Sequence, residues 1–405
     1  MDMVRDHVSE ITPVGSLRRF DATVGDISLL AVTPSAPKFF DDVAAMPDIK
    51  VLNRKGTTLT LEFERDRVTF HTTPPESAGA SLVWHTGSRR HTNELVRRAK
   101  QRALEIGPLG VRALKTDQLV STRSEKQVYA LVGLPFIAPE LREGEGEIEA
   151  AEAGALPVLL ERPDIRGDLH MHSIWSDGHD TIDAMVRQSV GLGYEYIAIT
   201  DHSQSSGAAY GLTAERLERQ RGEVEEVRQR FPGITIFHGT EVDILPNGEL
   251  DYPDAVLVDL DIVLASLHDA SGQSGSQLTD RYLRAIRHPL VSIITHPTNR
   301  LVGYRPGYSL DLPRLFEAAV ETGTVLEIDG APAHLDMDGA LTRRAIGNGA
   351  MVAIDSDCHR AEWLDRQMTF GVSTARRGWA EARHVLNTRP LAELLQILSR
   401  KRGNR

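Results

Sequence analysis

The sequence predicts an α/β protein in which a closed or nearly closed (β/α) barrel follows a smaller α+β unit. Seven apolar runs of strand length recur between residues 165 and 359, and helix-like stretches separate them. Continuous apolar runs are typical of strands that are buried on both faces of a parallel sheet. Seven such βα units in succession favour a barrel, with an open doubly wound sheet as the alternative.

The smaller unit comes first in the chain. The segments SLLAV, VLNRK, TLTLEFE and RVTFHTT are predicted strands, and the basic stretch NELVRRAKQRALEIG (residues 93–107) is a predicted helix. The Glu- and Gly-rich segment PELREGEGEIEAAEAGALP then ends this pattern. We therefore place the domain boundary near residue 150, which gives predicted domains of residues 1–150 and 151–405.

The barrel strands are expected in seven segments that begin at residues 165, 194, 234, 261, 291, 324 and 351. In chain order these segments are IRGDLHMH, YEYIAITDH, ITIFHGTE, DIVLASLH, VSIITH, TVLEID and MVAIDSDCH. Helices are expected between them, for example over TIDAMVRQSVGLG and AERLERQRGEVEEVRQRF. This alternation is the rhythm of βα units.

Composition excludes several classes of protein. The 405 residues are 41% hydrophobic and 25% charged, which is typical of a globular chain. The single cysteine, Cys358, permits no intramolecular disulfide, and the N-terminus lacks the apolar run of a signal peptide, so we expect a cytoplasmic location and no membrane partner. The net charge of −11 leaves nucleic acid open as a partner, because carboxylates that hold cations can attract anions once loaded.

Polar side chains gather at the C-terminal ends of the predicted barrel strands, where such folds build their active sites. His170 and His172, at i,i+2 spacing, point to one face of the first strand. Six histidines and three carboxylates at one end of a barrel predict a metal site. The nine candidate ligands are His170, His172, Asp177, His202, Glu241, His268, His296, Asp357 and His359.

Nine ligands exceed the need of one tetrahedral ion, so we expect two to three divalent ions with a carboxylate bridging a pair. Mixed imidazole and carboxylate ligands favour Mn²⁺, Zn²⁺ or Fe²⁺ over Mg²⁺. Cys358 is expected to face away from the ligands on either side of it. The remaining histidines with no such position are expected to serve packing or to lie at the surface: His179, His238, His288, His334 and His384.

The motifs GDLHMHSIWSDG, ITDHS, GTEVDI, ASLH, THPTNR and DSDCH resemble those of the PHP (polymerase and histidinol phosphatase) superfamily. The resemblance covers roughly residues 165–385 and is greatest to the PHP domain of bacterial X-family DNA polymerases. It implies a distorted seven-stranded barrel with a trinuclear centre. It also implies one ion on His170, His172, Glu241 and Asp357, a second on Glu241, His268 and His296, and a third on Asp177, His202 and His359.

Two loops depart from the family pattern. The chain has HPTN where the family usually has HPTG. It has EIDGAPAHLD where the family usually has EINA followed by Arg-Leu-Asp, so that His334 replaces an arginine. Both departures concern substrate contacts and leave all nine metal positions matched.

The resemblance extends upstream, where GSLRR and GDISLL look like a polymerase palm and HTGS looks like its thumb. Nucleotidyl transfer needs three carboxylates to hold two metal ions. The corresponding residues here are Asp26, Ser28 and Thr69, so only one carboxylate survives. We therefore interpret the first domain as a nucleotidyltransferase-like palm and thumb remnant without polymerase activity.

Gly15, Ser16 and Arg19 remain of the segment that would hold a triphosphate. These residues indicate residual nucleotide binding. Alternatively, Arg18 and Arg19 serve only to support the fold. The basic side chains from Arg89 to Arg102 could likewise follow a phosphate backbone or form a solvated helix face.

The sequence thus predicts a metal-dependent phosphoesterase that acts on DNA 3′ ends, as a 3′→5′ exonuclease or end-processing enzyme in repair. His170, His172, Glu241 and Asp357 would carry catalysis, with Arg300 and Arg305 as phosphate contacts. The alternatives are a small-molecule phosphatase of the histidinol-phosphatase type and a non-catalytic module that binds nucleic acid or nucleotides. The oligomeric state stays open.

Overall fold

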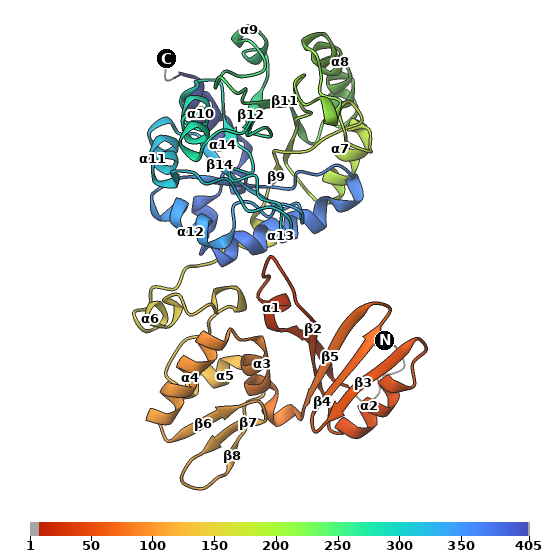
Figure 1. The fold of residues 1–405 in the computed structure, drawn as a ribbon, viewed down its shortest axis with the longest axis vertical. Coiled ribbons are helices and arrows are strands. Elements are labelled where there is room, and N and C mark those ends of the chain that lie inside the picture. Colours follow the sequence, from red (N-terminus) through yellow and green to blue (C-terminus); the bar gives the residue numbers. More distant parts are fainter. Residues whose placement is uncertain (1–7, 404–405) are drawn as a thin grey trace. The chain divides into compact units, whose positions relative to one another are not determined.

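The chain forms two compact units, one that ends at Leu156 and one that begins at Pro157 (Figure 1). The structure, a computed structural model, describes residues 8–403. Within that range no helix has the length and apolar character needed to cross a bilayer.

The first unit opens with a five-stranded mixed sheet of order β1-β2-β5-β4-β3. Strands β2 and β5 are parallel neighbours, and the other pairs are antiparallel. All four strands predicted here from the sequence are present. The elements are β1 (Glu10–Val14), α1 (Gly15–Arg18), β2 (Ile27–Val32), α2 (Ala36–Ala44), β3 (Ile49–Lys55), β4 (Thr58–Phe63) and β5 (Asp66–Thr73).

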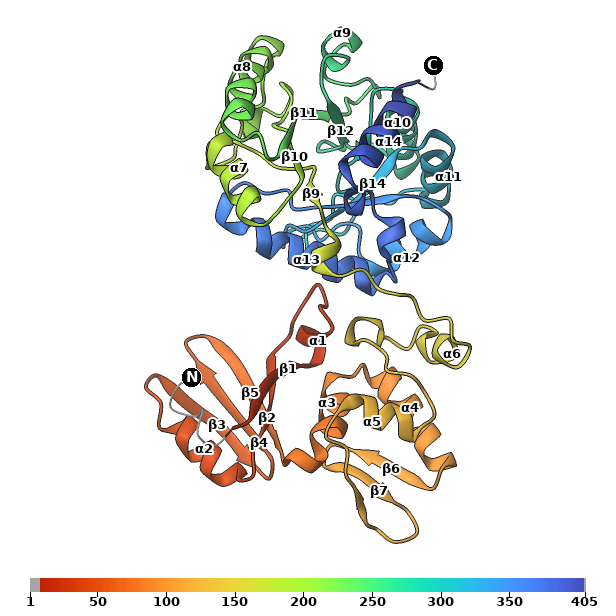
Figure 2. The ribbon, with the colours of Figure 1, turned by 180° about the vertical axis from the view of Figure 1, so that it is seen from behind.

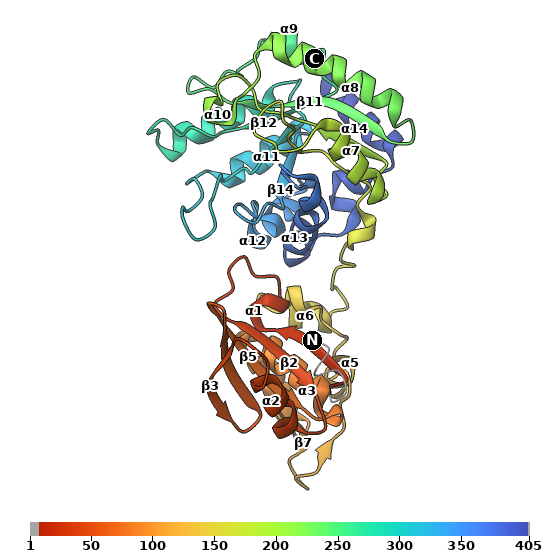
Figure 3. The same ribbon diagram turned by 90° about the vertical axis from the view of Figure 1, so that its right-hand side faces the viewer.

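Helix α2 is held against this sheet by an apolar cluster (Figure 3). Phe39 and Phe40 of α2 are fully buried with Leu59 and Leu61 of β4. Burying a side chain of this size contributes about 1.5–3 kcal/mol.

The rest of the first unit is helical with a small three-stranded sheet of order β6-β7-β8. Helix α4 begins after Ser88, whose side chain accepts a hydrogen bond from the N–H of His91 at 3.4 Å. The elements are α3 (Ala78–Thr86), α4 (Arg89–Gln101), β6 (Leu104–Gly107), β7 (Gly110–Ala113), β8 (Leu119–Val120), α5 (Glu125–Leu131) and α6 (Glu147–Glu152).

The predicted helix over residues 93–107 is wrong in its last part. Helix α4 ends at Gln101, and Ala103 adopts a left-handed backbone conformation with φ of +56°. Residues 104–107 then pair with β7 in an antiparallel hairpin, with Leu104 opposite Ala113. The hairpin partner satisfies the backbone groups that a longer helix would have paired.

The second unit is a seven-stranded parallel sheet whose strands follow chain order from β9 to β15. All seven predicted strands are present, and the order never reverses, which excludes the doubly wound alternative. The strands are β9 (Gly167–Asp168), β10 (Tyr196–Ile199), β11 (Thr235–Asp243), β12 (Ile262–Ser266), β13 (Ile293–Ile294), β14 (Val325–Asp329) and β15 (Val352–Asp355).

The sheet nearly closes on itself, as expected for a (β/α)₇ barrel. Met171 and Cys358, just beyond the first and last strands, form a parallel bridge, and the N–H of His172 donates to the carbonyl of Cys358 at 2.9 Å. Cys358 is fully buried within the apolar core, as predicted. The bridge therefore places the first motif, GDLHMHSIWSDG, beside the last motif, DSDCH.

Helices enclose the strands, as the two opposite views in Figures 1 and 2 show. Several begin at side-chain caps, for example at Thr181 and Thr213, which accept bonds from backbone N–H groups. The helices are α7 (Ile182–Gly191), α8 (Ala214–Arg230), α9 (Asp254–Leu257), α10 (Gly275–Arg287), α11 (Leu312–Thr322), α12 (Gly339–Gly347), α13 (Leu364–Arg377) and α14 (Leu391–Gly403).

Candidate metal centre

The C-terminal ends of the barrel strands bring the nine predicted ligands into overlapping clusters of nitrogen and oxygen atoms. Three groups each have ligand atoms within 4.8 Å of one another. They are His172, Asp177, His202 and His359; His170, His172 and Asp357; and His202, Glu241 and His268. His296 adjoins the third group, because its Nε2 lies 2.9 Å from Glu241 Oε1.

His170 and His172 extend from β9 into the centre of the barrel mouth. Their Nε2 atoms lie 3.1 Å apart, and His172 Nε2 lies 3.1 Å from Asp357 Oδ1. Both histidines are fully buried. Asp357 has a left-handed backbone with φ of +47°, which is unusual for a residue with a side chain and is typical of functional sites.

Asp177 joins His202 and His359 at the outer part of the cluster. Its carboxylate oxygens lie 3.5 Å from His202 Nε2 and 3.3 Å from His359 Nε2. Gly178 follows Asp177 because a Cβ there would lie 2.6 Å from the carbonyl of His172. Buried Asp201 fixes the same loop by accepting bonds from the N–H groups of Ser173 and Ser176.

Glu241 lies at the middle of the whole arrangement. Its two oxygens face five of the histidines: Oε1 lies 3.4 Å from His268 Nε2, and Oε2 lies 3.5 Å from His170 Nε2. Oε2 also lies 2.8 Å from His202 Nδ1, outside hydrogen-bond geometry. A carboxylate that faces several imidazoles in this way suits a bridge between cations.

The residues present fit the multinuclear metal centre that the family implies. His172 Nδ1, Glu241 Oε2 and His296 Nδ1 are buried and find no hydrogen-bond partner within residues 8–403. Buried polar atoms are ordinarily paired, so these atoms are suited to bind a cation. The donor set of imidazole nitrogens and carboxylate oxygens suits divalent transition metals.

The protonation states differ among the ligands. Burial acts to lower the pKa of His268 and His359, but Glu241 beside the first and Asp177 beside the second raise it to about 9, so a cation would displace a proton there. Burial, with His202 and His359 nearby, lowers the pKa of His172 to about 3, so its ring is neutral. Burial acts to raise the pKa of Glu241, but the adjacent His202 and His268 hold it well below its usual range. Neutral imidazole and ionised carboxylate are the forms that bind cations.

Two functional carboxylates escaped the sequence analysis. Glu327 of β14 accepts from His170 Nδ1 at 2.6 Å and from the N–H of His296 at 2.7 Å. Asp243 of β11 pairs with His268 Nδ1 at 2.8 Å. Such partners orient ligand histidines and fix the tautomer. The signal in the sequence was an acidic residue inside a strand buried on both faces, in VLEID and GTEVD.

The two predicted phosphate contacts lie on the loop after β13. The guanidinium of Arg300 donates to the carbonyls of His334 and Leu335 and lies 3.3 Å from Asp338 Oδ2. Exposed Arg305 donates through Nη2 to the backbone and side-chain oxygens of Asn299 at 2.8 and 2.9 Å. Arg300 therefore holds a neighbouring loop, whereas Arg305 keeps donors for a ligand.

The inferred polymerase residues lie together in the first unit. Ser28 and Thr69 are direct partners on the parallel strands β2 and β5, and Asp26 immediately precedes β2. Thr69 Oγ1 lies 3.3 Å from Thr60 Oγ1. The hydroxyl-bearing residues Ser28 and Thr69 thus lie side by side on neighbouring strands.

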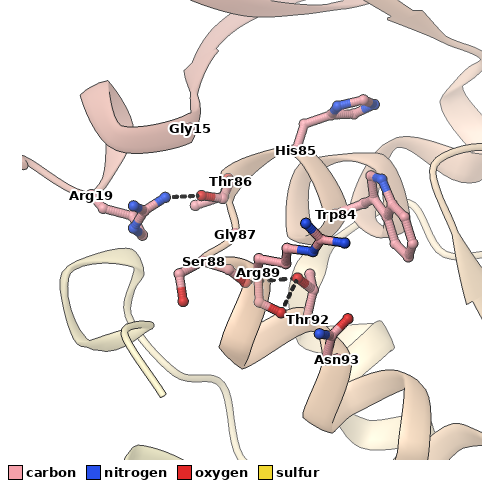
Figure 4. A pocket seen from close by; sticks show the side chains of 10 residues that line it. All are labelled: Gly15, Arg19, Trp84, His85, Thr86, Gly87, Ser88, Arg89, Thr92 and Asn93. Atoms are coloured by element: carbon pink, nitrogen blue, oxygen red, sulfur yellow. Dashed lines mark hydrogen bonds between the residues drawn. The ribbon is translucent and has the colours of Figure 1, made fainter. Parts of the chain in front are cut away.

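A pocket of about 510 Å³ lies between α1, α3 and α4 (Figure 4). Gly15 and Arg19 line it, together with residues 84–89, Thr92 and Asn93; Ser16 is not among the lining residues. Arg19 donates to the carbonyl of Thr86 at 2.6 Å, and Arg18 pairs with Glu125 at 2.7 Å. Both arginines therefore support the fold, whatever else they bind.

Two family models match the chain. DNA polymerase beta thumb matches residues 81–143, and PHP domain matches residues 168–298. The second match covers the strands that carry His170 to His296.

Similar proteins include a DNA polymerase/3′-5′ exonuclease PolX of Bacillus subtilis. It is 38% identical over 408 residues, which cover 98% of this chain and 71% of that protein. A protein of Thermoanaerobacter named probable phosphatase is 31% identical over 204 residues, or 47% of this chain and 78% of its own length. A probable phosphatase of Syntrophotalea carbinolica is 32% identical over 170 residues, or 40% of this chain and 65% of its own length.

Proposed function

This chain belongs to the X-family DNA polymerases that carry a PHP domain, and we propose that it is a metal-dependent phosphoesterase of nucleic-acid 3′ ends. The activity would be 3′→5′ exonuclease or 3′-end processing in DNA repair. The observation that carries this proposal is the set of nine ligand-type residues around Glu241 at the barrel mouth, of which six are buried.

In the proposed mechanism, the protein positions the phosphoester through fixed side chains. His170, His172, Glu241 and Asp357 would hold one cation, with the other five residues holding one or two more. When bound, divalent ions supply Lewis-acid stabilisation of phosphoryl oxygens and lower the pKa of water towards neutrality. Glu327 and Asp243 keep His170 and His268 oriented, and Arg305 would hold a non-bridging phosphate oxygen.

We further propose that polymerase activity is lost. Asp26 is the one carboxylate in the palm arrangement, beside the hydroxyls of Ser28 and Thr69. Neutral hydroxyls cannot offset the charge of two divalent cations or help to activate a 3′-hydroxyl. The thumb-like region would keep its role in binding DNA.

The decisive assay uses the purified full chain with Mn²⁺ and four labelled substrates: single-stranded DNA, 3′-phosphorylated DNA, histidinol phosphate and a chromogenic phosphodiester. We expect release of nucleotides or of phosphate from DNA 3′ ends. Asp357→Ala should lower the rate by about 10³ or more, because losing a ligand removes several kcal/mol of transition-state stabilisation. No primer extension is expected in the presence of a template and nucleotides.

His288→Ala is the matched control, because His288 lies before β13, away from the ligand ends of the strands, and contacts Asp254 at 3.1 Å. It should keep wild-type activity. Asp357→Ala with undiminished turnover would exclude the cluster as the working centre. Primer extension that requires Asp26 would show that the palm still functions.

A small-molecule phosphatase is the second candidate, because proteins named probable phosphatase match 40–47% of this chain. Efficient turnover of histidinol phosphate, with none of DNA, would favour that function.

A further inference from the structure

A fourth group of ligand-type side chains adjoins the nine-residue cluster. One ligand atom each from Asp329, His334 and Asp357 lies within 4.8 Å of the others. Asp329 ends β14, and His334 lies in the loop that follows. The ring of His334 stacks on that of His296, with centroids 5.3 Å apart and an interplanar angle of 23°. Asp329 and His334 are outside the nine ligands described above.

Two atoms of this group lack the partners that burial requires. Asp329 is fully buried; its Oδ1 accepts from the N–H of Ala331 at 2.6 Å, whereas its Oδ2 has no hydrogen-bond partner in the described part of the chain. The same is true of His334 Nδ1. An unpaired buried carboxylate oxygen beside the carboxylate of Asp357 is unfavourable unless a proton or a cation neutralises it.

The guanidinium of Arg300, on the loop after β13, is engaged with other groups. Arg300 donates its Nε to the carbonyl of His334 at 2.8 Å and also contacts Leu335 and Asp338. It therefore holds the backbone of the loop and leaves the side chains of Asp329 and His334 to another partner.

We propose that Asp329, His334 and Asp357 form a further divalent-cation site that shares Asp357 with the main centre. One imidazole and two carboxylates suit Mn²⁺, Zn²⁺ or Fe²⁺, with solvent or a phosphate oxygen completing the coordination. Ligands about 2.0–2.2 Å from one ion lie roughly 3–4 Å from each other, which fits the observed spacing.

Two substitutions in the second of the loops that depart from the family pattern become chemically consistent with this site. Asp329 stands where the family usually has asparagine, and His334 where it usually has arginine. A cation held by these residues would place positive charge on the loop in place of the missing guanidinium. The site would thereby contribute to binding the phosphate of the substrate.

The test counts metal ions bound to the full chain, so it needs no substrate and does not depend on which phosphoester is hydrolysed. The protein is stripped with chelator, reconstituted with Mn²⁺ or Zn²⁺, freed of unbound metal and measured by elemental analysis and native mass spectrometry. We expect Asp329→Asn and His334→Gln each to bind one equivalent fewer than wild type. The double variant should lose no more than either single variant, because all three lack the same ion.

Asp329→Asn keeps the shape of the side chain and the oxygen that accepts from Ala331, and circular dichroism verifies folding. His288→Gln, with its histidine remote from the cluster, should keep the wild-type count. Anomalous diffraction from Mn²⁺-soaked crystals should show a peak among the three side chains that is absent from Asp329→Asn.

The proposed site is overturned if both single variants bind as many metal ions as wild type. It is also overturned if the double variant binds two ions fewer than wild type. If His170→Ala lowers the count while Asp329→Asn does not, the main centre stands and the further site fails. If the wild-type protein hydrolyses no phosphoester but Asp329→Asn binds one ion fewer than wild type, the proposed function is rejected and this site is supported.

Discussion

At the scale of single residues, Glu327 shows how one buried carboxylate can organise two ligands. Its Oε1 accepts from the ring of His170, and its Oε2 accepts from the backbone of His296. With Nδ1 of His170 engaged in this way, Nε2 is left to face the cluster. Glutamine has one acceptor oxygen, so it cannot accept both bonds.

We therefore predict that Glu327→Gln weakens metal binding about 10- to 100-fold, the usual effect of removing a partner of a ligand histidine. Competition with a coloured chelator for Zn²⁺ or Mn²⁺ measures the affinity directly. Glu321→Gln, at an exposed position near the end of α11, is the control and should bind as wild type does. Equal affinity in Glu327→Gln and wild type would show that Glu327 only fills space.

The sequence indicates eight of the nine ligand-type residues because each ends or directly follows an apolar run, and parallel strands end on the same side of a barrel. Asp177 lies in the loop after the first run. Asp243 and Glu327 lie inside such runs, where the apolar pattern indicates only a buried core strand. Their roles depend on which histidine lies opposite, such as His268 for Asp243, and this follows only from the register of neighbouring strands.

At the scale of elements, the helical part of the first unit is joined by a buried charge network. Arg142 is fully buried; it pairs with Glu125 of α5 at 2.7 Å and donates twice to the carbonyl of Ile137. Glu125 also pairs with Arg18 of α1. The network thus ties α1, α5 and the segment after α5 together.

Arg142→Met should destabilise the chain by about 3 kcal/mol, near the lower end for breaking a buried ion pair, because Arg18 still faces Glu125. Urea unfolding followed by circular dichroism measures the change. Arg97→Met, which removes an exposed pair with Glu94, is the control and should unfold as wild type does. A midpoint for Arg142→Met equal to that of the control would contradict the structural role of the network.

The elements themselves were predictable to different degrees. The seven barrel strands are found from their apolar runs, because burial on both faces leaves little ambiguity. The hairpin of β6 and β7 was missed, since strands of four residues next to a helix continue its apolar pattern. Only the pairing of Leu104 with Ala113 decides between helix and strand there.

At the scale of the whole molecule, the proposed function assigns hydrolysis to the barrel unit and contacts with DNA to the thumb-like region of the first unit. The thumb-like region carries the basic helix α4, where Arg97 and Arg98 pair with Glu94 and Glu152. Arg89, Lys100 and Arg102 are exposed and form no ion pair with another described residue. These three side chains, with the equally exposed Arg90, are therefore the best candidates for contacts with a phosphate backbone.

Replacing Arg89, Lys100 and Arg102 together with glutamine should weaken DNA binding and slow DNA hydrolysis, while turnover of a small chromogenic phosphodiester stays unchanged. The slope of log affinity against log salt concentration should flatten by about 0.7 to 0.9 for each lost contact. A matched triple variant of Arg187, Arg314 and Arg383, exposed arginines of the barrel unit, removes the same charge and should bind DNA as wild type does. If the α4 variant loses activity equally on DNA and on the chromogenic phosphodiester, it has a folding defect. If both triple variants weaken DNA binding equally, the effect is due to net charge and not to the position of these residues on α4.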